Sequence, residues 1–185
     1  MIAAVAQHCQ HVSDYISLDG EDALVLEVSR SLRYFGGLAR IRQGIESGLP
    51  TPLRQGDFVQ AVAPSASASL LMARSGFESA ISSPDDLRSR LGSMPVSALA
   101  IDLRVRRKLT KCGLFHLRDI WRLPLPELRI RFGRDFSEYI EQCLGLRPEV
   151  RHRWQPAHDY RTCIEADHGL HSVQQILSAC EQLLC

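Results

Sequence analysis

The spacing of hydrophobic residues predicts a helix and two strands at the start of the chain. Residues 1–12 place apolar side chains on one side of a helix, and residues 12–18 alternate between two faces as a strand does. Residues 23–28 form a nearly unbroken apolar run, which is typical of a strand buried on both faces. The Asp19-Gly20 pair between the two strands favours a tight turn, so we expect a hairpin.

The same kind of patterning continues after the hairpin. It predicts a helix over residues 38–48, a strand over residues 58–63 and a helix over residues 65–75 that ends at Gly76. A hairpin followed by a helix, a strand and a helix favours an α+β sandwich, in which the helices lie on one face of a small sheet.

A break in composition at residues 82–86 separates this part from a helical one, because two serines, a proline and two aspartates follow one another there. From this break to Leu146 the pattern predicts short helices. Residues 147–158 are polar and contain two prolines, so we expect a linker. After the linker, residues 160–166 favour a strand and residues 172–184 a helix.

The composition is that of an ordinary globular protein, with 45% hydrophobic and 23% charged residues among 185. No apolar run approaches the ~18 residues of a membrane helix. The start of the chain lacks the basic region of a secretory signal, so we expect a cytoplasmic location. Six cysteines lie far apart without a C-x-x-C pair, so we expect buried thiols rather than disulfides or a zinc site.

The net charge of +1 hides an uneven distribution along the chain. Residues 1–82 hold six Lys and Arg against eight Asp and Glu, whereas residues 83–145 hold twelve against eight. Residues 146–185 hold four against five. A polyanionic partner is therefore expected to bind the middle of the chain.

The strongest candidate for a binding site lies in this basic part. A helix that ends at Gly113, a tight turn and a second helix with regularly spaced apolar residues form the helix-hairpin-helix pattern. Glycine lets the backbone turn sharply, and amide N–H groups at the turn and at the next helix start can then point at one phosphate. Nearby cations add attraction for the DNA backbone. The candidate DNA-binding residues are Arg107, Lys108, Lys111, Gly113, Leu114, Phe115, His116 and Arg118.

The alternative for this segment is a plain turn between two helices with a capping glycine. Helix-hairpin-helix turns usually carry a second glycine two residues after the first, and that position holds Phe115 here. The basic excess of the region favours DNA binding over the plain turn.

The acidic segment 19–27 is the second candidate site. Carboxylates beside a strand can hold a pair of Mg²⁺ ions for nucleotidyl transfer. Such a pair needs carboxylates from more than one strand, and the sequence shows no second acidic strand, so we favour a solvated turn. The Gly36-Gly37 pair lacks the lysine and the spacing of phosphate-binding loops, and the histidines show no triad spacing. We assign no catalytic residue.

Several stretches taken together resemble the Y-family DNA polymerases, and most closely their ImuB branch. Residues 16–37, which contain ISLD and ALVLEVSRSLRYFGG, resemble the palm signature of that branch. Residues 61–74, which contain AVAPS and LLMAR, resemble the palm strand and helix that follow. Residues 109–123 resemble the thumb hairpin and residues 132–146 its closing helix, so the resemblance covers nearly the whole chain.

The resemblance implies an α+β protein in three parts, incomplete at both ends. Residues 1–82 would form a partial palm-like α/β sandwich, residues 83–146 an all-α helix-hairpin-helix thumb, and residues 147–185 a linker with the start of a little-finger domain. Active members of the family bind metal through an adjacent Asp-Glu pair on the palm strand, and these two positions hold Asp22 and Ala23 here. Asp22 is thus a vestigial metal candidate, and we expect neither a bound metal nor another cofactor.

ImuB-type proteins act as non-catalytic scaffolds in SOS-induced mutagenesis. The resemblance therefore implies a DNA-binding factor in translesion DNA repair, with DNA as its partner and no membrane contact. An ImuA-type protein, an error-prone replicative-type polymerase and the sliding clamp would bind through regions outside this chain. Two alternatives stay open. One is an active error-prone Y-family polymerase whose Mg²⁺ site is completed by sequence missing here, and the other is a structural helical adaptor that touches no DNA.

Overall fold

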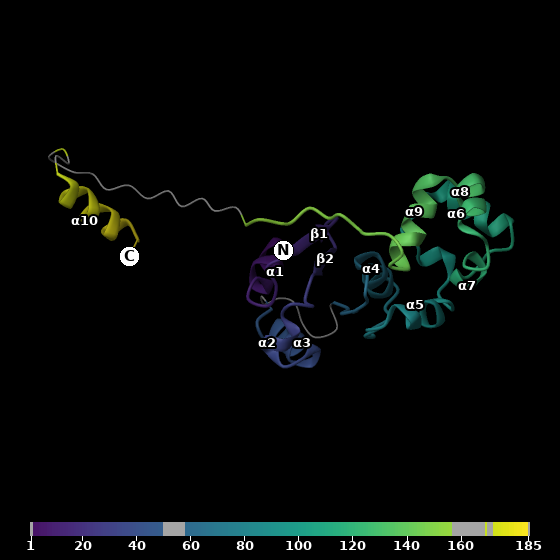
Figure 1. Cartoon of the computed structure of the whole chain (residues 1–185), viewed down its shortest axis with the longest axis horizontal. Coiled ribbons are helices and arrows are strands. Elements are labelled where there is room, and N and C mark those ends of the chain that lie inside the picture. The colour runs from purple at the N-terminus through teal and green to yellow at the C-terminus, as the bar shows by residue number, and fades with distance from the viewer. Residues whose placement is uncertain (1, 50–57, 157–168, 170–171, 185) are drawn as a thin grey trace. The chain divides into compact units, whose positions relative to one another are not determined.

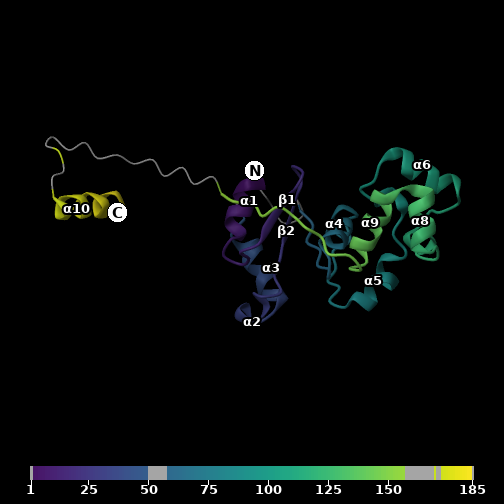
Figure 2. The same cartoon turned by 45° about the horizontal axis from the view of Figure 1, so that its top comes forward.

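The computed structural model describes residues 2–49, 58–156, 169 and 172–184. Contacts divide the chain into two compact units, Met1–Trp154 and Gln155–Cys185. The first unit holds α1 to α9 with both strands, and the second holds α10 (Figure 1, Figure 2). Each unit is described by itself.

The predicted hairpin is confirmed. Strands β1 (Ile16–Asp19) and β2 (Ala23–Leu26) pair in antiparallel fashion to give a two-stranded sheet. At the turn, Asp19 lies opposite Ala23, and Gly20 takes a φ of +66° that glycine adopts without strain.

Three helices belong to the same part of the chain as the hairpin: α1 (Ile2–Cys9), α2 (Leu32–Phe35) and α3 (Leu38–Ser47). α1 contacts both strands, and α2 contacts α3. The core that they share is small and consists of Ala6, Cys9, Val12, Ile16 and Ile41. Burial raises the pKa of the Cys9 thiol to about 11, which keeps it neutral. The expectation of buried thiols is met by Cys9 and Cys143 but not by Cys112 and Cys180, which are exposed.

The predicted strand over residues 58–63 is wrong. A single parallel bridge between Val62 and Ala80 is the only pairing there among the described residues. The N–H of Val62 donates to the carbonyl of Ser79, and the N–H of Ile81 donates to that of Val62. Pro64 follows two residues later and has no N–H with which to extend the pairing.

The predicted helix after this segment is confirmed as α4 (Ala66–Arg74). It begins where the hydroxyl oxygen of Ser65 accepts a hydrogen bond from the N–H of Ala68 at 3.2 Å. The Ser65 hydroxyl also donates to the carbonyl of Cys143 at 3.2 Å, which ties the start of this helix to the end of α9.

The predicted helical part is also confirmed. It runs through α5 (Pro84–Leu91), the 3₁₀ turn η1 (Val96–Ala98), α6 (Leu103–Lys111), α7 (Leu117–Ile120), α8 (Leu125–Phe132) and α9 (Arg134–Cys143). These helices share the larger core of the unit with α4, which contributes Ala68, Leu71 and Met72. The larger core therefore contains residues from both sides of the composition break at 82–86.

The second unit contains α10 (Val173–Leu184), which matches the predicted C-terminal helix. Its apolar residues Val173, Ile176 and Leu177 are exposed. The predicted strand over residues 160–166 lies outside the described residues. Across the part of the chain that the structure describes, none of the helices is long and apolar enough to cross a membrane.

Candidate nucleic-acid interface and acidic corner

Helices α6 and α7 are joined by a tight turn at residues 112–116, where the sequence pattern predicted one. Gly113 has a φ of +76°, a left-handed backbone conformation. Its N–H donates to the carbonyl of Thr110 at 3.0 Å, and the N–H of Leu114 donates to that of Leu109 at 3.0 Å. These two bonds close the C-terminus of α6.

The carboxylate of Asp119 caps the other side of the turn. One of its oxygens accepts hydrogen bonds from the backbone N–H groups of Phe115 at 3.2 Å and His116 at 2.9 Å. The His116 side chain bonds in return to the backbone N–H of Asp119, which completes a capping box. The hydrogen bonds from His116 and then from Phe115 favour the ionised carboxylate and lower the pKa of Asp119 below its ordinary 3.8.

The remaining amides also have partners within the protein. The N–H of Leu117 donates to the carbonyl of Met94, and that of Arg118 to the carbonyl of Gly92, both at 3.0 Å. Each backbone N–H from residue 112 to residue 119 thus has a protein acceptor. The prediction that these amides point at a phosphate is therefore not met in this structure, because Asp119 and nearby carbonyls already accept their hydrogen bonds.

Three cations beside the turn are better placed for an anionic ligand. Arg107, Lys111 and Arg118 are exposed and make no ion pair with any residue that the structure describes. Lys108 differs, because its Nζ donates to a backbone carbonyl at the end of α8 and lies 5.7 Å from the centre of the Phe132 ring. Arg107, Lys111 and Arg118 therefore remain available to a phosphate.

The uncharged residues of the turn differ in exposure. Phe115 is 54% exposed, His116 is half-buried, and Leu114 packs against the larger core. The structure thus brings all the predicted DNA-binding residues to one turn and its flanking helices. It assigns Leu114 and Lys108 to internal contacts, and it leaves Phe115 exposed beside the free cations.

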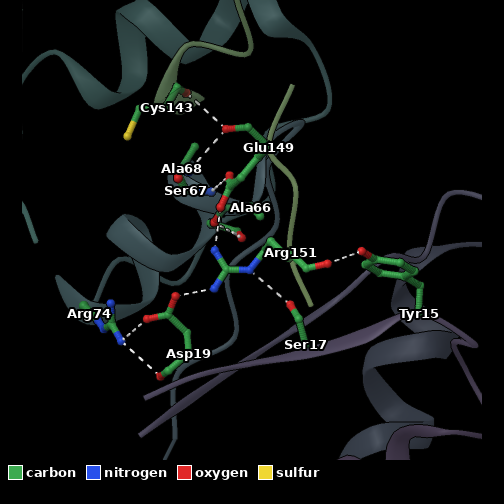
Figure 3. Close-up of polar contacts among 12 residues, drawn as sticks. Tyr15, Ser17, Asp19, Ala66, Ser67, Ala68, Arg74, Cys143, Glu149 and Arg151 are labelled. Atoms are coloured by element: carbon green, nitrogen blue, oxygen red, sulfur yellow. Dashed lines mark hydrogen bonds and ion pairs between the residues drawn. The ribbon is translucent and has the colours of Figure 1, made fainter. Parts of the chain in front are cut away.

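A second polar cluster lies where β1 meets α4 and the segment after α9 (Figure 3). We call it the acidic corner, and it consists of Asp19, Asp22, Arg74, Glu149 and Arg151. One guanidinium nitrogen of Arg74 lies 2.7 Å from a carboxylate oxygen of Asp19 and 3.0 Å from one of Asp22. Arg74, the last residue of α4, therefore pairs with both carboxylates beside the hairpin turn.

Arg151 reaches the same carboxylate from the other side. Its guanidinium pairs with Asp19 and, at 2.5 Å, with Glu149, while its Nε donates to the Ser17 hydroxyl oxygen at 3.1 Å. Partial burial acts to raise the pKa of Asp19. The hydrogen bonds and charges of Arg151 and Arg74 outweigh this effect and lower that pKa below its ordinary 3.8.

The residues of the acidic corner do not fit a pair of divalent ions. Asp22 stands at the first of the two palm positions, but Ala23 at the second offers no ligand atom. Asp22 and Asp19 are both paired with guanidinium groups. The described residues contain no group of three or more His, Cys, Asp or Glu side chains arranged to hold a metal ion.

Sequence reasoning singled out Asp22 but missed Arg74, Glu149 and Arg151. Arg74 lies 55 positions and Arg151 132 positions along the chain from Asp19. No local spacing or periodicity connects residues so far apart, so only the folded chain reveals the cluster.

Comparison with known proteins gives the chain its relatives. No model of a protein family matches it. It is similar to Protein ImuB of Caulobacter vibrioides, in strains NA1000 / CB15N and ATCC 19089 / CIP 103742 / CB 15. Identity is 28% over 159 residues, which make up 84% of this chain and 34% of each relative. The chain thus spans about a third of the length of these curated relatives.

Among solved structures, the chain is similar to the crystal structure of DinB from Sulfolobus solfataricus. The TM-score is 0.59 at 18% identity, and the match covers 82% of this chain and 47% of that one. The α+β fold predicted from the sequence is therefore confirmed. The fold shared with DinB and the sequence similarity to Protein ImuB confirm the predicted resemblance to Y-family polymerase-like proteins of the ImuB type.

Proposed function

We propose that the chain is the DNA-binding part of a non-catalytic, Y-family-polymerase-like factor that acts in translesion DNA repair and SOS mutagenesis. The observation that carries the proposal is the pairing of Arg74 with both Asp19 and Asp22. A catalytic palm needs free carboxylates that hold divalent ions for in-line transfer. In this chain the carboxylates of Asp19 and Asp22 are paired with guanidinium groups, and Ala23 supplies no atom that could bind a metal ion.

The DNA-binding half of the proposal rests on the side chains around the turn. Arg107, Lys111 and Arg118 are exposed, and no ion pair within the described residues has to break before they meet a phosphate. The exposed Phe115 adds apolar surface among them. Contacts of this kind grip the sugar–phosphate backbone and carry no sequence information.

The wider role follows from the resemblance to ImuB rather than from residues of this chain. An ImuA-type protein, an error-prone replicative-type polymerase and the sliding clamp would bind through other regions of the full-length protein. A factor that binds chromosomal DNA would work in the cytoplasm. Gripping the DNA backbone through side chains requires neither a metal nor another cofactor.

Primer extension by the full-length protein tests the non-catalytic half. The protein is incubated with a primer–template, the four deoxynucleoside triphosphates and either Mg²⁺ or Mn²⁺, and we expect no extension. The Asp22→Ala variant is the matched control. Extension by the protein would overturn the proposal in favour of an active error-prone polymerase, and loss of that extension in the variant would identify Asp22 as one of its metal ligands.

A gel-shift titration tests the DNA-binding half. The 185-residue chain is titrated against duplex DNA at low salt, where contacts with phosphates are strongest. We expect retardation at micromolar protein. No retardation under these conditions would favour a structural helical adaptor that touches no DNA.

A further inference from the structure

The segment after α9 lies along the open edge of β1. The carbonyl of Tyr15 accepts the N–H of Glu27 at 3.0 Å, so the backbone groups of Tyr15 face the β2 side. Neighbouring residues of a strand point their backbone groups to opposite edges, so those of Ile16 face away from β2. On that side the carbonyl of Ile16 accepts the N–H of Trp154 at 2.7 Å.

Exposure alternates over residues 149–152, as in an extended chain laid against a surface, and Arg153 after them is exposed as well. The side chains of Glu149 and Arg151 are 13% and 16% exposed, whereas Val150 between them is 94% exposed. Trp154 packs against the smaller core, which also contains residues of α1 and β1. The segment therefore turns Glu149, Arg151 and Trp154 toward the rest of the unit.

Polar contacts fasten the segment to two elements and to the residue before β1 (Figure 3). The Tyr15 hydroxyl donates to the carbonyl oxygen of Arg151 at 2.5 Å. The Glu149 carboxylate accepts the N–H of Ser67 in the first turn of α4 at 2.9 Å, a position where the helix dipole favours an anion. The Arg151 guanidinium pairs with Asp19 at the end of β1.

Arg151 joins the two carboxylates that would otherwise repel each other. Its guanidinium contacts Asp19 on the strand and Glu149 on the segment itself. Without Arg151, Asp19 would still pair with Arg74, and Glu149 would still accept the N–H of Ser67. No cation would then lie between the two carboxylates. Removing one partner of a partly buried charge cluster leaves the remaining charges uncompensated.

We propose that residues 149–154 form a strap that docks on the open edge of β1, and that Arg151 is the residue that positions it. The strap covers an edge of β1 that pairs with no other strand of the described residues, and whose backbone groups would otherwise be free to pair with another chain. It also fixes where the chain leaves the first unit. When the strap is docked, the connection to α10 begins at residue 155. When the strap is released, the connection begins after Arg147, which pairs with Glu138 of α9 at 3.2 Å.

Hydrogen exchange of the Trp154 amide measures docking directly, because that N–H bonds to Ile16. The test compares Arg151→Ala with Arg153→Ala in the 185-residue chain. Arg153 is the matched control, since it lies two residues away, is exposed and makes no polar contact with any described residue. We expect the amides of the strap to exchange at least tenfold faster in Arg151→Ala, while Arg153→Ala matches the parent.

Tryptophan fluorescence gives a second readout. The chain has two tryptophans, so a Trp121→Phe background leaves Trp154 as the sole reporter. The buried Trp121 indole N–H has no hydrogen-bond partner, so phenylalanine removes no such bond. We expect Arg151→Ala to shift the Trp154 emission to longer wavelength, because release of the strap exposes the ring to water.

The amides of α9 report whether a variant is folded. Equal exchange at Trp154 in Arg151→Ala and Arg153→Ala, with α9 protected in both, would refute the role of Arg151. If the amides of α9 also lose protection from exchange in Arg151→Ala, the test uses the milder variant Tyr15→Phe instead. This variant removes a single hydroxyl from the contacts of the strap. Faster exchange in the strap of that variant supports the proposal, and an unchanged rate refutes it. None of these readouts involves DNA or nucleotide transfer, so they stand apart from the tests of the proposed function.

Discussion

The carboxylate of Asp119 accepts the backbone N–H of His116 at 2.9 Å. An anion that belongs to the protein therefore occupies the amides that the sequence pattern assigned to a phosphate. DNA would have to be held by side chains around the turn, and the first prediction tests this consequence.

Replacing Lys111 with glutamate should weaken binding to duplex DNA and lower the salt dependence of the binding constant. Loss of one phosphate contact should reduce the salt slope by about one. Arg33→Glu is the control, since Arg33 is an exposed cation of α2 and the charge change is the same. Fluorescence anisotropy over a range of salt concentrations measures both variants. Equal effects of the two would mean that net charge, rather than the turn, governs binding.

Alanine at Gly113 should destabilise the chain by about 1–2 kcal/mol, because a side chain disfavours its left-handed backbone. The space itself is free, since an added Cβ would meet no atom within 4 Å. Gly44→Ala is the contrasting variant, because Gly44 lies inside α3 and its Cβ would meet His11 Nε2 at an ordinary 3.6 Å. That variant should gain roughly 0.5–1 kcal/mol. Urea unfolding measures both, and a loss at Gly44 equal to that at Gly113 would contradict the backbone explanation.

Acid should destabilise the fold through Asp19 and Asp119. Both carboxyls have pKa values lowered below 3.8 in the folded chain, so the unfolded chain binds protons more readily. The stabilisation that they provide is present above the unfolded pKa and is lost as pH falls through the lower folded values. Unfolding curves between pH 6 and pH 2 should show this loss, and Asp19→Asn should make it shallower. Asp14→Asn is the control, because it leaves Asp19 paired with Arg74 and Arg151, and this variant should lose stability in acid as the parent does. If Asp19→Asn also loses stability with pH as steeply as the parent, Asp19 does not contribute to the acid sensitivity.

Truncation of Leu109 should be costly, because its side chain is fully buried beneath the turn. Leu109→Ala removes buried methyl groups from the larger core, and such changes cost about 2–5 kcal/mol. Ile130→Ala on α8 is the control, since Ile130 is 84% exposed and its loss should change stability by no more than about 0.5 kcal/mol. Thermal unfolding of the two variants gives the comparison, and similar melting temperatures would show that Leu109 is not a core residue.

Local features of the fold could be predicted from the sequence because each depends on neighbouring residues. The hairpin follows from an apolar run beside Asp19-Gly20, and the turn before α7 follows from Gly113. The cap formed by Asp119 also had a local signal, an acidic residue three positions after the first capping residue, His116.

Features that join distant segments had no such signal. Arg151 reaches Asp19 across 132 positions of sequence, and neither residue type nor spacing marks the pair. The strand expected over residues 58–63 failed for a related reason. Its apolar character is local, whereas strand pairing depends on a distant partner, and among the described residues that partner is the single residue Ala80. Periodicity therefore predicts elements more reliably than it predicts their partners.

The larger core has a practical consequence for anyone who wishes to study the turn in a shorter polypeptide. Leu71 and Met72 of α4 are buried together with Leu109 and Ile120. A fragment that begins at residue 83 would lack Leu71 and Met72. The apolar surface that these residues cover would then be exposed to solvent and would favour aggregation. The shortest soluble piece that carries the turn should therefore begin ahead of α4.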